Sequence, residues 1–167
     1  DSQRLYAAFA CESHDPAAIR ADTPREARDS PRLHEEDTVS LLLDPERSQN
    51  DCYQWTVNAQ GAILDQVLHR LVYTERMVPS PEWSSRAEAA GARGDGRWCV
   101  ELAIPFSDIP SRDRNAVAAD TAWGFQAARQ NRTPSDPTES ASAWSSTFRV
   151  EEPDSFGVAS FTGAPVN

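Results

Sequence analysis

The sequence predicts an all-β fold, a jelly-roll-like antiparallel β-sandwich of two sheets with minor helix. Apolar and polar residues alternate over several short segments, which places every second side chain on one face of a strand. Turn-forming residues separate these segments, with 7 Gly and 12 Pro among 167 residues. No internal repeat or heptad pattern is present, and short strands joined by turn chemistry are typical of a sandwich or barrel.

The first half of the chain predicts four strands. Asp44-Pro45 ends the second strand, because the residue before proline is restricted in conformation. Asn58–Gly61 predicts a hairpin turn in which Gly61 supplies a positive φ. A long polar loop with a helical turn at Pro16–Arg20 separates the first two strands. The four strands are expected at Leu5–Cys11, Thr38–Asp44, Cys52–Asn58 and Ile63–Arg70.

The second half predicts four more strands, separated by a loop at 71–82, a turn at Gly91–Gly96 and a Ser/Thr/Pro-rich loop that ends at Ala143. Trp83–Ala90 is ambiguous, because its Ala and Glu content favours helix while its neighbours favour strand. We interpret it as a strand. The four strands are expected at Trp83–Ala90, Arg97–Ile104, Ala122–Arg129 and Gly157–Phe161.

Alternation also predicts which side chains form the core. Large rings share one face of their strands and are expected to point inward, as tryptophans in alternating strands usually do. Trp83 is expected to be buried as well. Their strand neighbours then form a polar strip on the opposite side. The inward set is Tyr53, Trp55, Trp98, Val100, Trp123 and Phe125, and the polar strip is Ser40, Gln54, Glu101 and Gln126.

Length and composition suit one domain over residues 1–167, with ordinary globular content. The net charge of −10 argues against nucleic acid and anionic membrane partners, which need clustered cations. A neutral ligand is the easiest to reconcile with this charge. No apolar run of about 18 residues is present, so we expect no membrane insertion.

Catalytic and redox signatures are weak. His14, His34 and His69 lie in separate segments, and no hydrolase or zinc-protease motif is present. Axial haem ligation has little support, since Met77 is the single methionine and sits in a predicted loop. The three cysteines match no zinc spacing, and they are expected to be buried thiols or to form one disulfide: Cys11, Cys52 and Cys99.

An ordered series of motifs resembles the family 9 carbohydrate-binding modules and the sandwich superfamily that contains them. Each motif alone is weak, but the order spans nearly the whole chain. The motifs are Leu5–Phe9, Asp37–Pro45, Tyr53–Gly61, Trp98–Phe106, Trp123–Arg129, Ala143–Ser145 and Phe156-Gly157.

This resemblance implies non-catalytic sugar binding, a secreted, periplasmic or cell-surface location, neighbouring domains in a longer protein, and no cofactor beyond a structural calcium. Two departures bear on it. Ser40 stands where sugar-gripping members look to have an acidic residue, and His34 replaces an upstream aromatic platform. The family usually has a strand before the Leu5-Tyr6 motif, so the domain is expected to lack this N-terminal strand.

Trp144 is the best candidate for stacking on a sugar ring, because it lies in a polar loop without alternating partners. Aromatic faces suit the C–H side of sugars, and polar groups bond the hydroxyls. Trp144 also matches the late tryptophan of the sugar-binding members. Trp144 could equally be a loop anchor, the polar strip an ordinary solvated face, and Arg129 a bridge between loops. The candidate ligand-binding residues are Trp144, Gln126, Arg129, Gln54 and Glu101.

Four aspartates near turns are oxygen donors of the kind that calcium prefers. Capping of turns by aspartate side chains explains the same positions and is favoured for most of them. The metal ligands therefore stay undetermined among Asp15, Asp37, Asp44 and Asp51.

The function hypothesis is a non-catalytic carbohydrate-binding module that recognises a neutral sugar or polysaccharide end. The alternative is an interaction or spacer domain of a larger secreted or outer-membrane protein, without a sugar ligand. A stand-alone hydrolase with paired carboxylates is the third hypothesis, because Asp and Glu are plentiful at 26 residues.

Overall fold

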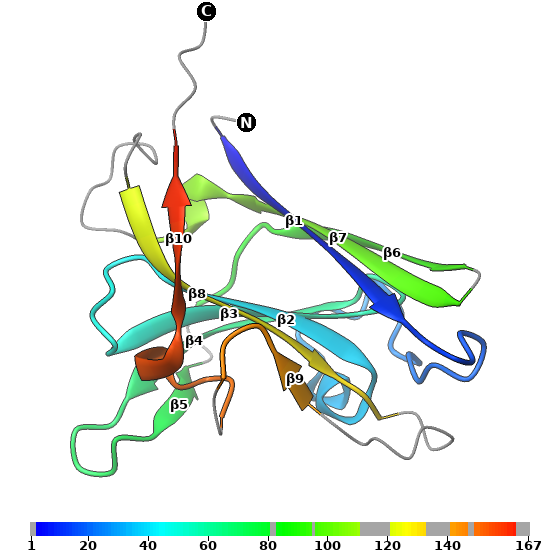
Figure 1. Ribbon diagram of the computed structural model, residues 1–167, viewed down its shortest axis with the longest axis horizontal. Coiled ribbons are helices and arrows are strands. Elements are labelled where there is room, and N and C mark those ends of the chain that lie inside the picture. The colour runs from blue at the N-terminus through cyan, green and yellow to red at the C-terminus, as the bar shows by residue number, and fades with distance from the viewer. Residues whose placement is uncertain are drawn as a thin grey trace, which may run out of the picture.

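The computed structural model describes residues 3–80, 83–94, 96–110, 121–132, 141–146 and 149–162. Within them the chain forms two antiparallel sheets that face each other (Figure 1). The smaller sheet has the order β1-β7-β6, from Arg4–Glu12, Arg97–Pro105 and Glu88–Gly94. The predicted antiparallel β-sandwich is therefore confirmed.

The larger sheet has the order β10-β8-β2-β3-β4-β5, and β9 also pairs with β8. Its strands are β2 Thr38–Asp44, β3 Asp51–Asn58, β4 Ile63–Arg70, β5 Met77–Ser80, β8 Thr121–Gln130, β9 Ala141–Ala143 and β10 Gly157–Phe161. The described helices are single 3-10 turns, η1 Pro31–Glu35, η2 Phe106–Asp108 and η3 Pro153–Ser155, and none of these could cross a membrane.

The main core lies between the two sheets and is built from the alternating residues that the sequence singles out. Trp55 and Trp98 are completely buried, and Trp123 is nearly so. Trp55 pairs in register with Leu41 on β2, so the rows of inward side chains continue across neighbouring strands. Burying each large apolar side chain contributes about 1.5–3 kcal/mol, which makes this core the main source of stability. Trp83 is half-buried and packs against the Trp55 ring at a centroid distance of 5.5 Å.

A second, smaller core covers the outer face of the larger sheet. Leu42, Cys52 and Leu68 are buried there under Met77 and Phe156. The sheet is therefore covered on both faces along part of its length. The segment that carries η3 provides some of this cover, and it also reaches the edge of β8, where the candidate site lies.

The observed secondary structure corrects the prediction in several segments. Trp83–Ala87 is not in a strand, whereas β6 continues past Gly91 to Gly94, where a turn was predicted. Strands β5 and β9 replace segments predicted as loops. The expected helical turn at Pro16–Arg20 is an isolated non-helical turn.

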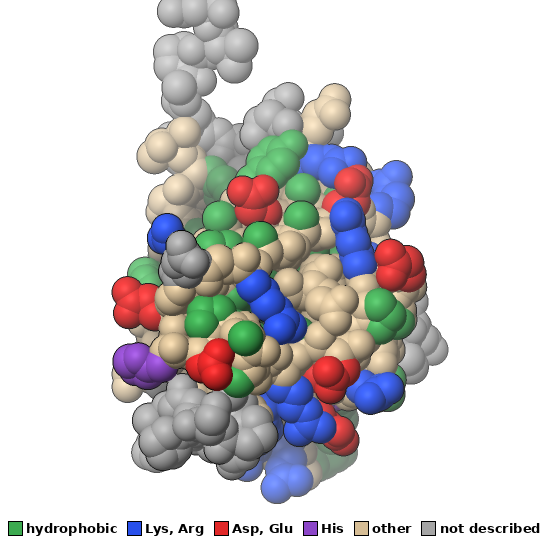
Figure 2. Space-filling model, turned by 90° about the vertical axis from the view of Figure 1, so that its right-hand side faces the viewer, with side chains coloured by type: hydrophobic (Ala, Val, Ile, Leu, Met, Phe, Trp, Pro, Cys, Tyr) green, Lys and Arg blue, Asp and Glu red, His purple; other side chains and the backbone are tan. Residues whose placement is uncertain are grey.

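The acidic net charge is not concentrated on the side of the molecule shown in Figure 2. Arginine and acidic side chains are interspersed there, with small apolar groups between them. Such a mixed surface creates no single-sign field that would steer a charged polymer toward this side.

Candidate functional site: a groove at the open edge of the sandwich

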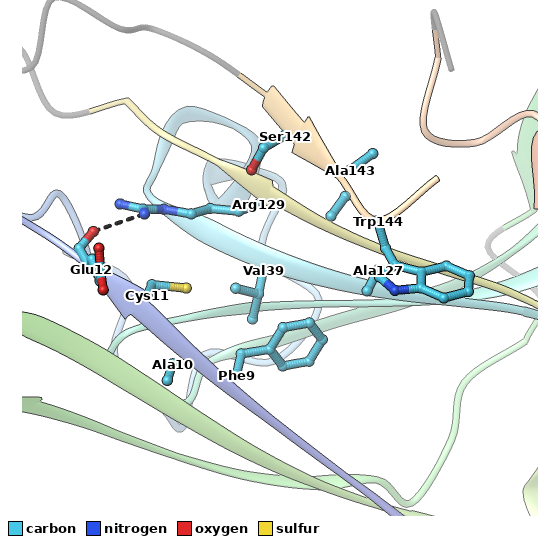
Figure 3. A pocket seen from close by; sticks show the side chains of 11 residues that line it. Phe9, Ala10, Cys11, Glu12, Val39, Ala127, Arg129, Ser142, Ala143 and Trp144 are labelled. Atoms are coloured by element: carbon cyan, nitrogen blue, oxygen red, sulfur yellow. Dashed lines mark hydrogen bonds between the residues drawn. The ribbon is translucent and has the colours of Figure 1, made fainter. Parts of the chain in front are cut away.

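A groove of about 430 Å³ opens between β1, which is an edge strand of the smaller sheet, and β8 with its neighbour β9 in the larger sheet (Figure 3). β1 and β8 belong to different sheets, and no strand pairing joins them. We call this side of the sandwich the open edge. The groove is shallow, and its lining combines apolar side chains with the polar groups of Glu12, Arg129 and Ser142. Its principal side chains are Phe9, Cys11, Val39, Ala127, Arg129 and Trp144.

The strand order along β8 places Trp144 at this groove. β10 pairs with the first half of β8 and β9 with its last three residues, both along the same side. The segment that follows β9 fills the gap between them, where the Trp144 backbone N–H donates to the Ala127 carbonyl at 2.8 Å. The Trp144 side chain is 63% exposed, and its ring meets Phe125 edge-on at a centroid distance of 5.2 Å. The tryptophan is thus both a loop anchor and an open aromatic surface.

Arg129 lies at the opposite end of the groove from Trp144 (Figure 3). Its Nη1 donates to the Glu12 carbonyl at 2.8 Å, and its Cζ lies 5.9 Å from the centre of the Trp98 ring. Arg129 therefore bridges β8 to β1 and covers the core. Its Nε is buried and has no hydrogen-bond partner among the described residues.

Gln126 lies behind the groove and does not open into it. The side chain is completely buried on the outer face of β8. Its Nε2 donates to Ser145 Oγ at 2.6 Å, and its Oε1 accepts the Ser145 backbone N–H at 3.0 Å. Gln126 thus clamps the residue after Trp144, and its place in the structure is that of a support.

The remaining members of the predicted polar strip lie apart from the groove. Gln54 is buried on the outer face of the larger sheet and accepts from Gln66 Nε2 at 2.8 Å. Ser40 bonds Thr56 across the same face at 2.9 Å. Glu101 is exposed on the outer face of the smaller sheet, in register with Ala8. The predicted polar strip does not form one surface, because Glu101 lies on the other sheet, and the alternative of a solvated face fails for Gln54 and Gln126, which are buried.

Of the residues that line the groove, Trp144 and Arg129 were predicted as site residues and the others were not. Phe9 lies on the same strand face as the buried Cys11, and because β1 is an edge strand this face meets the groove. Glu12 and Ser142 supply polar groups on the rim. No local pattern marks them, because they become neighbours only through the packing of β1 against β8 and β9.

Cys11 lines the groove as an inert thiol. Burial raises the pKa of Cys11 to about 11, and the nearby Arg129 charge only partly offsets this shift. Burial also raises the pKa of the Cys52 thiol. All three cysteines are free. Because the thiolate is the reactive form, Cys11 has no nucleophilic role near neutral pH.

The aspartates proposed as calcium donors are dispersed, and backbone amides already engage three of them. The Asp15 and Asp44 side chains accept backbone N–H bonds within their own turns, and Asp37 accepts those of Arg20 and Arg132. Asp51 pairs with His69. Among the described residues no three acidic, His or Cys side chains converge, so these four aspartates do not fit a metal site.

Comparison with known proteins locates this architecture among carbohydrate-binding structures. No protein-family model and no curated protein sequence matches the chain. A candidate carbohydrate-binding protein from Bacteroides uniformis superposes with a TM-score of 0.68 at 16% identity, over 96% of this chain and 74% of that one.

Two structures of a family 9 carbohydrate-binding module from Caldicellulosiruptor kristjanssonii are also similar. The glucose complex has a TM-score of 0.60 at 16% identity, over 100% of this chain and 75% of that one. The cellotriose complex has a TM-score of 0.61 at 17% identity, over 100% and 73%. The chain therefore has the fold of these modules, as the ordered motifs indicated.

Proposed function

We propose that this chain is a non-catalytic carbohydrate-binding module that holds a neutral sugar in the open-edge groove. The observation that carries the proposal is the exposed Trp144 indole, fixed at the mouth of a groove with a guanidinium at its other end. An aromatic face beside hydrogen-bonding groups matches a sugar ring, which has an apolar C–H side and polar hydroxyls. The shared fold with modules solved with glucose and cellotriose supports the same ligand class.

Each groove group then has a separate role. The Trp144 face stacks on the sugar, and Phe9 and Val39 keep water away from the apolar side of the ring. Arg129 donates to a hydroxyl or ring oxygen, while Glu12 and Ser142 on the rim offer acceptors. Gln126 acts indirectly by holding Ser145, and Gln54 and Glu101 lie too far from the groove to take part.

Calorimetric titration tests the proposal, with glucose, cellobiose, cellotriose and a panel of other neutral oligosaccharides. Trp144→Ala should weaken binding about tenfold or more, because it removes the stacking surface. Tyr73→Ala is the matched control, since Tyr73 is a fully exposed aromatic outside the groove. Absence of binding heat across the panel, or equal loss in both variants, would refute the proposed site.

The catalytic alternative predicts turnover, so the same oligosaccharides should be incubated with the protein and analysed for released sugars. The proposed module leaves them intact. A secreted, periplasmic or cell-surface location and attachment to further domains belong to the same proposal, because sugar-binding modules act where polysaccharides are met. The sequence on either side of this chain in its gene tests both points.

One surface feature favours the interaction-domain alternative. The tip of the β4–β5 hairpin carries three consecutive exposed apolar side chains, Leu71, Val72 and Tyr73, the last two exposed by 87% and 100%. Exposed apolar patches of this kind mark contacts with other proteins. A photo-crosslinking amino acid at position 73 of the full-length protein would test this. Crosslinking to a neighbouring domain, together with no sugar binding, would favour the spacer function.

A further inference from the structure

The Trp144 indole rests in a notch on the neighbouring strand β10. A Cβ atom built on Gly157 would lie 2.0 Å from Trp144 Cζ3, and 2.8 and 3.1 Å from Cη2 and Cε3 on either side. If this Cβ lay above the ring face, its distances to the three atoms would be more nearly equal. The missing side chain of Gly157 therefore accommodates the outer edge of the benzo ring, not its face.

Phe125 completes the notch. It pairs in register with Gly157 on the adjacent strand, and its ring meets the indole at 5.2 Å with an interplanar angle of 77°. In Figure 3 the five-membered ring and Nε1 lie on the Arg129 side, while the benzo ring points away from Arg129. One end of the indole is thus held by β8 and β10, and the other end faces the groove.

We infer that Gly157 and Phe125 are positioning residues that preorganise Trp144 for its ligand, an inference that rests on the proposed function. An exposed tryptophan on a loop would lose conformational freedom when a ligand covers it, which weakens binding. An indole already fixed by the notch avoids most of this loss. Gly157 owes its importance to space alone, because its backbone does not adopt the left-handed conformation.

The test is Gly157→Ala, with Gly94→Ala as the matched control. Both glycines lie in strands near an end, but a Cβ at Gly94 meets nothing within 4 Å. The indole N–H signals of the 5 tryptophans are recorded by two-dimensional NMR, and Trp144→Phe identifies the Trp144 signal by its disappearance. Gly157→Ala should move the Trp144 signal and weaken cellotriose binding about tenfold. Gly94→Ala should change neither.

Repeating Gly157→Ala in the Trp144→Phe variant separates positioning of the indole from general destabilisation of the protein. Phenylalanine is shorter than tryptophan, so at position 144 it should not reach the notch. Gly157→Ala should then lower the melting temperature in the wild-type background and leave it nearly unchanged in the Trp144→Phe background. Equal effects in both backgrounds would contradict the notch.

The outcomes distinguish this inference from the proposed function. An unmoved Trp144 signal in Gly157→Ala overturns the inference, whatever the sugar titrations give. If Gly157→Ala moves the Trp144 signal but both Trp144→Ala and Gly157→Ala bind cellotriose with wild-type affinity, the groove is not the sugar site. Gly157 is then a packing residue only. A moved signal with weakened binding supports both.

Discussion

The two sides of the sandwich differ in how closely the two sheets pack against each other. On the side of β6 the two sheets are closed, because backbone packs directly on backbone. A Cβ on Gly91 would lie 2.3 Å from the Ala59 carbonyl oxygen in the β3–β4 turn, so only glycine fits there. On the open edge, between β1 and β8, Gly157 provides similar room but accepts an exposed aromatic ring. Gly91 allows the two sheets to pack closely over the core, whereas Gly157 makes room for the exposed Trp144 ring.

The hydrogen bonds between polar groups also differ between the closed side and the open edge. On the closed side Asp65 is buried and accepts from Arg28 and from Ser85, while the Trp55 indole donates to Ser85 Oγ at 2.9 Å. At the open edge, Arg129 bridges the two sheets by donating to the Glu12 carbonyl. Stability is therefore concentrated on the closed side, which leaves the open edge free to carry a binding groove.

The largest expected effect comes from Asp65→Ala. This change removes the buried carboxylate that accepts from the Ser85 amide and pairs with Arg28. Arg28 keeps the Ser85 and Ala87 carbonyls as acceptors but loses this charge partner. Removing one partner of such a pair should cost about 3 kcal/mol of unfolding free energy, measured by urea denaturation. Asp51→Ala is the control, since the Asp51–His69 pair is half-exposed on both sides and should cost about 0.5 kcal/mol or less. Equal costs would show that the buried Asp65 contacts contribute no more to stability than a half-exposed ion pair.

Gly91→Ala should have the next largest effect. The added methyl group meets the Ala59 backbone, which cannot move aside as a flexible side chain can. The expected cost is about 2 kcal/mol, with sugar binding retained. Gly157→Ala should show the reverse pattern, with small loss of stability and clear loss of binding. If both substitutions reduce stability and binding in proportion, the contrast between the two sides fails.

Strands that alternate strictly could be predicted from the sequence, and those that depend on their neighbours could not. Arg97–Pro105 and Thr121–Gln130 place bulky side chains inward at every second position. β5 contains Pro79, which cannot donate to a sheet and therefore suggested a loop. β5 is tolerated because it is an edge strand that pairs only with β4. β9 has three small residues and no pattern to detect.

Two of the predicted site residues, Trp144 and Arg129, line the groove, and the clearest signal came from a residue without an alternating partner. Trp144 stood out for this reason and lies at the groove. Alternation correctly placed Gln54 and Gln126 on the face away from the main core, but it cannot show what covers that face. Ser145 and the segment around η3 provide part of that cover through contacts distant in sequence. The notch at Gly157 likewise depends on the pairing of β10 with β8.

The smallest expected effect concerns the accessibility of the cysteines. Cys99 is half-buried on the outer face of the smaller sheet, whereas Cys11 lies at the open edge and Cys52 under the second core. With a pKa of about 11, the Cys11 thiolate is a minor species at neutral pH. Its alkylation should accelerate by about tenfold per pH unit as pH rises toward that value. Mass spectrometry after iodoacetamide pulses should find Cys99 modified first, Cys11 next and Cys52 last. Modification of Cys52 before Cys11 would show that the second core opens more readily than the groove.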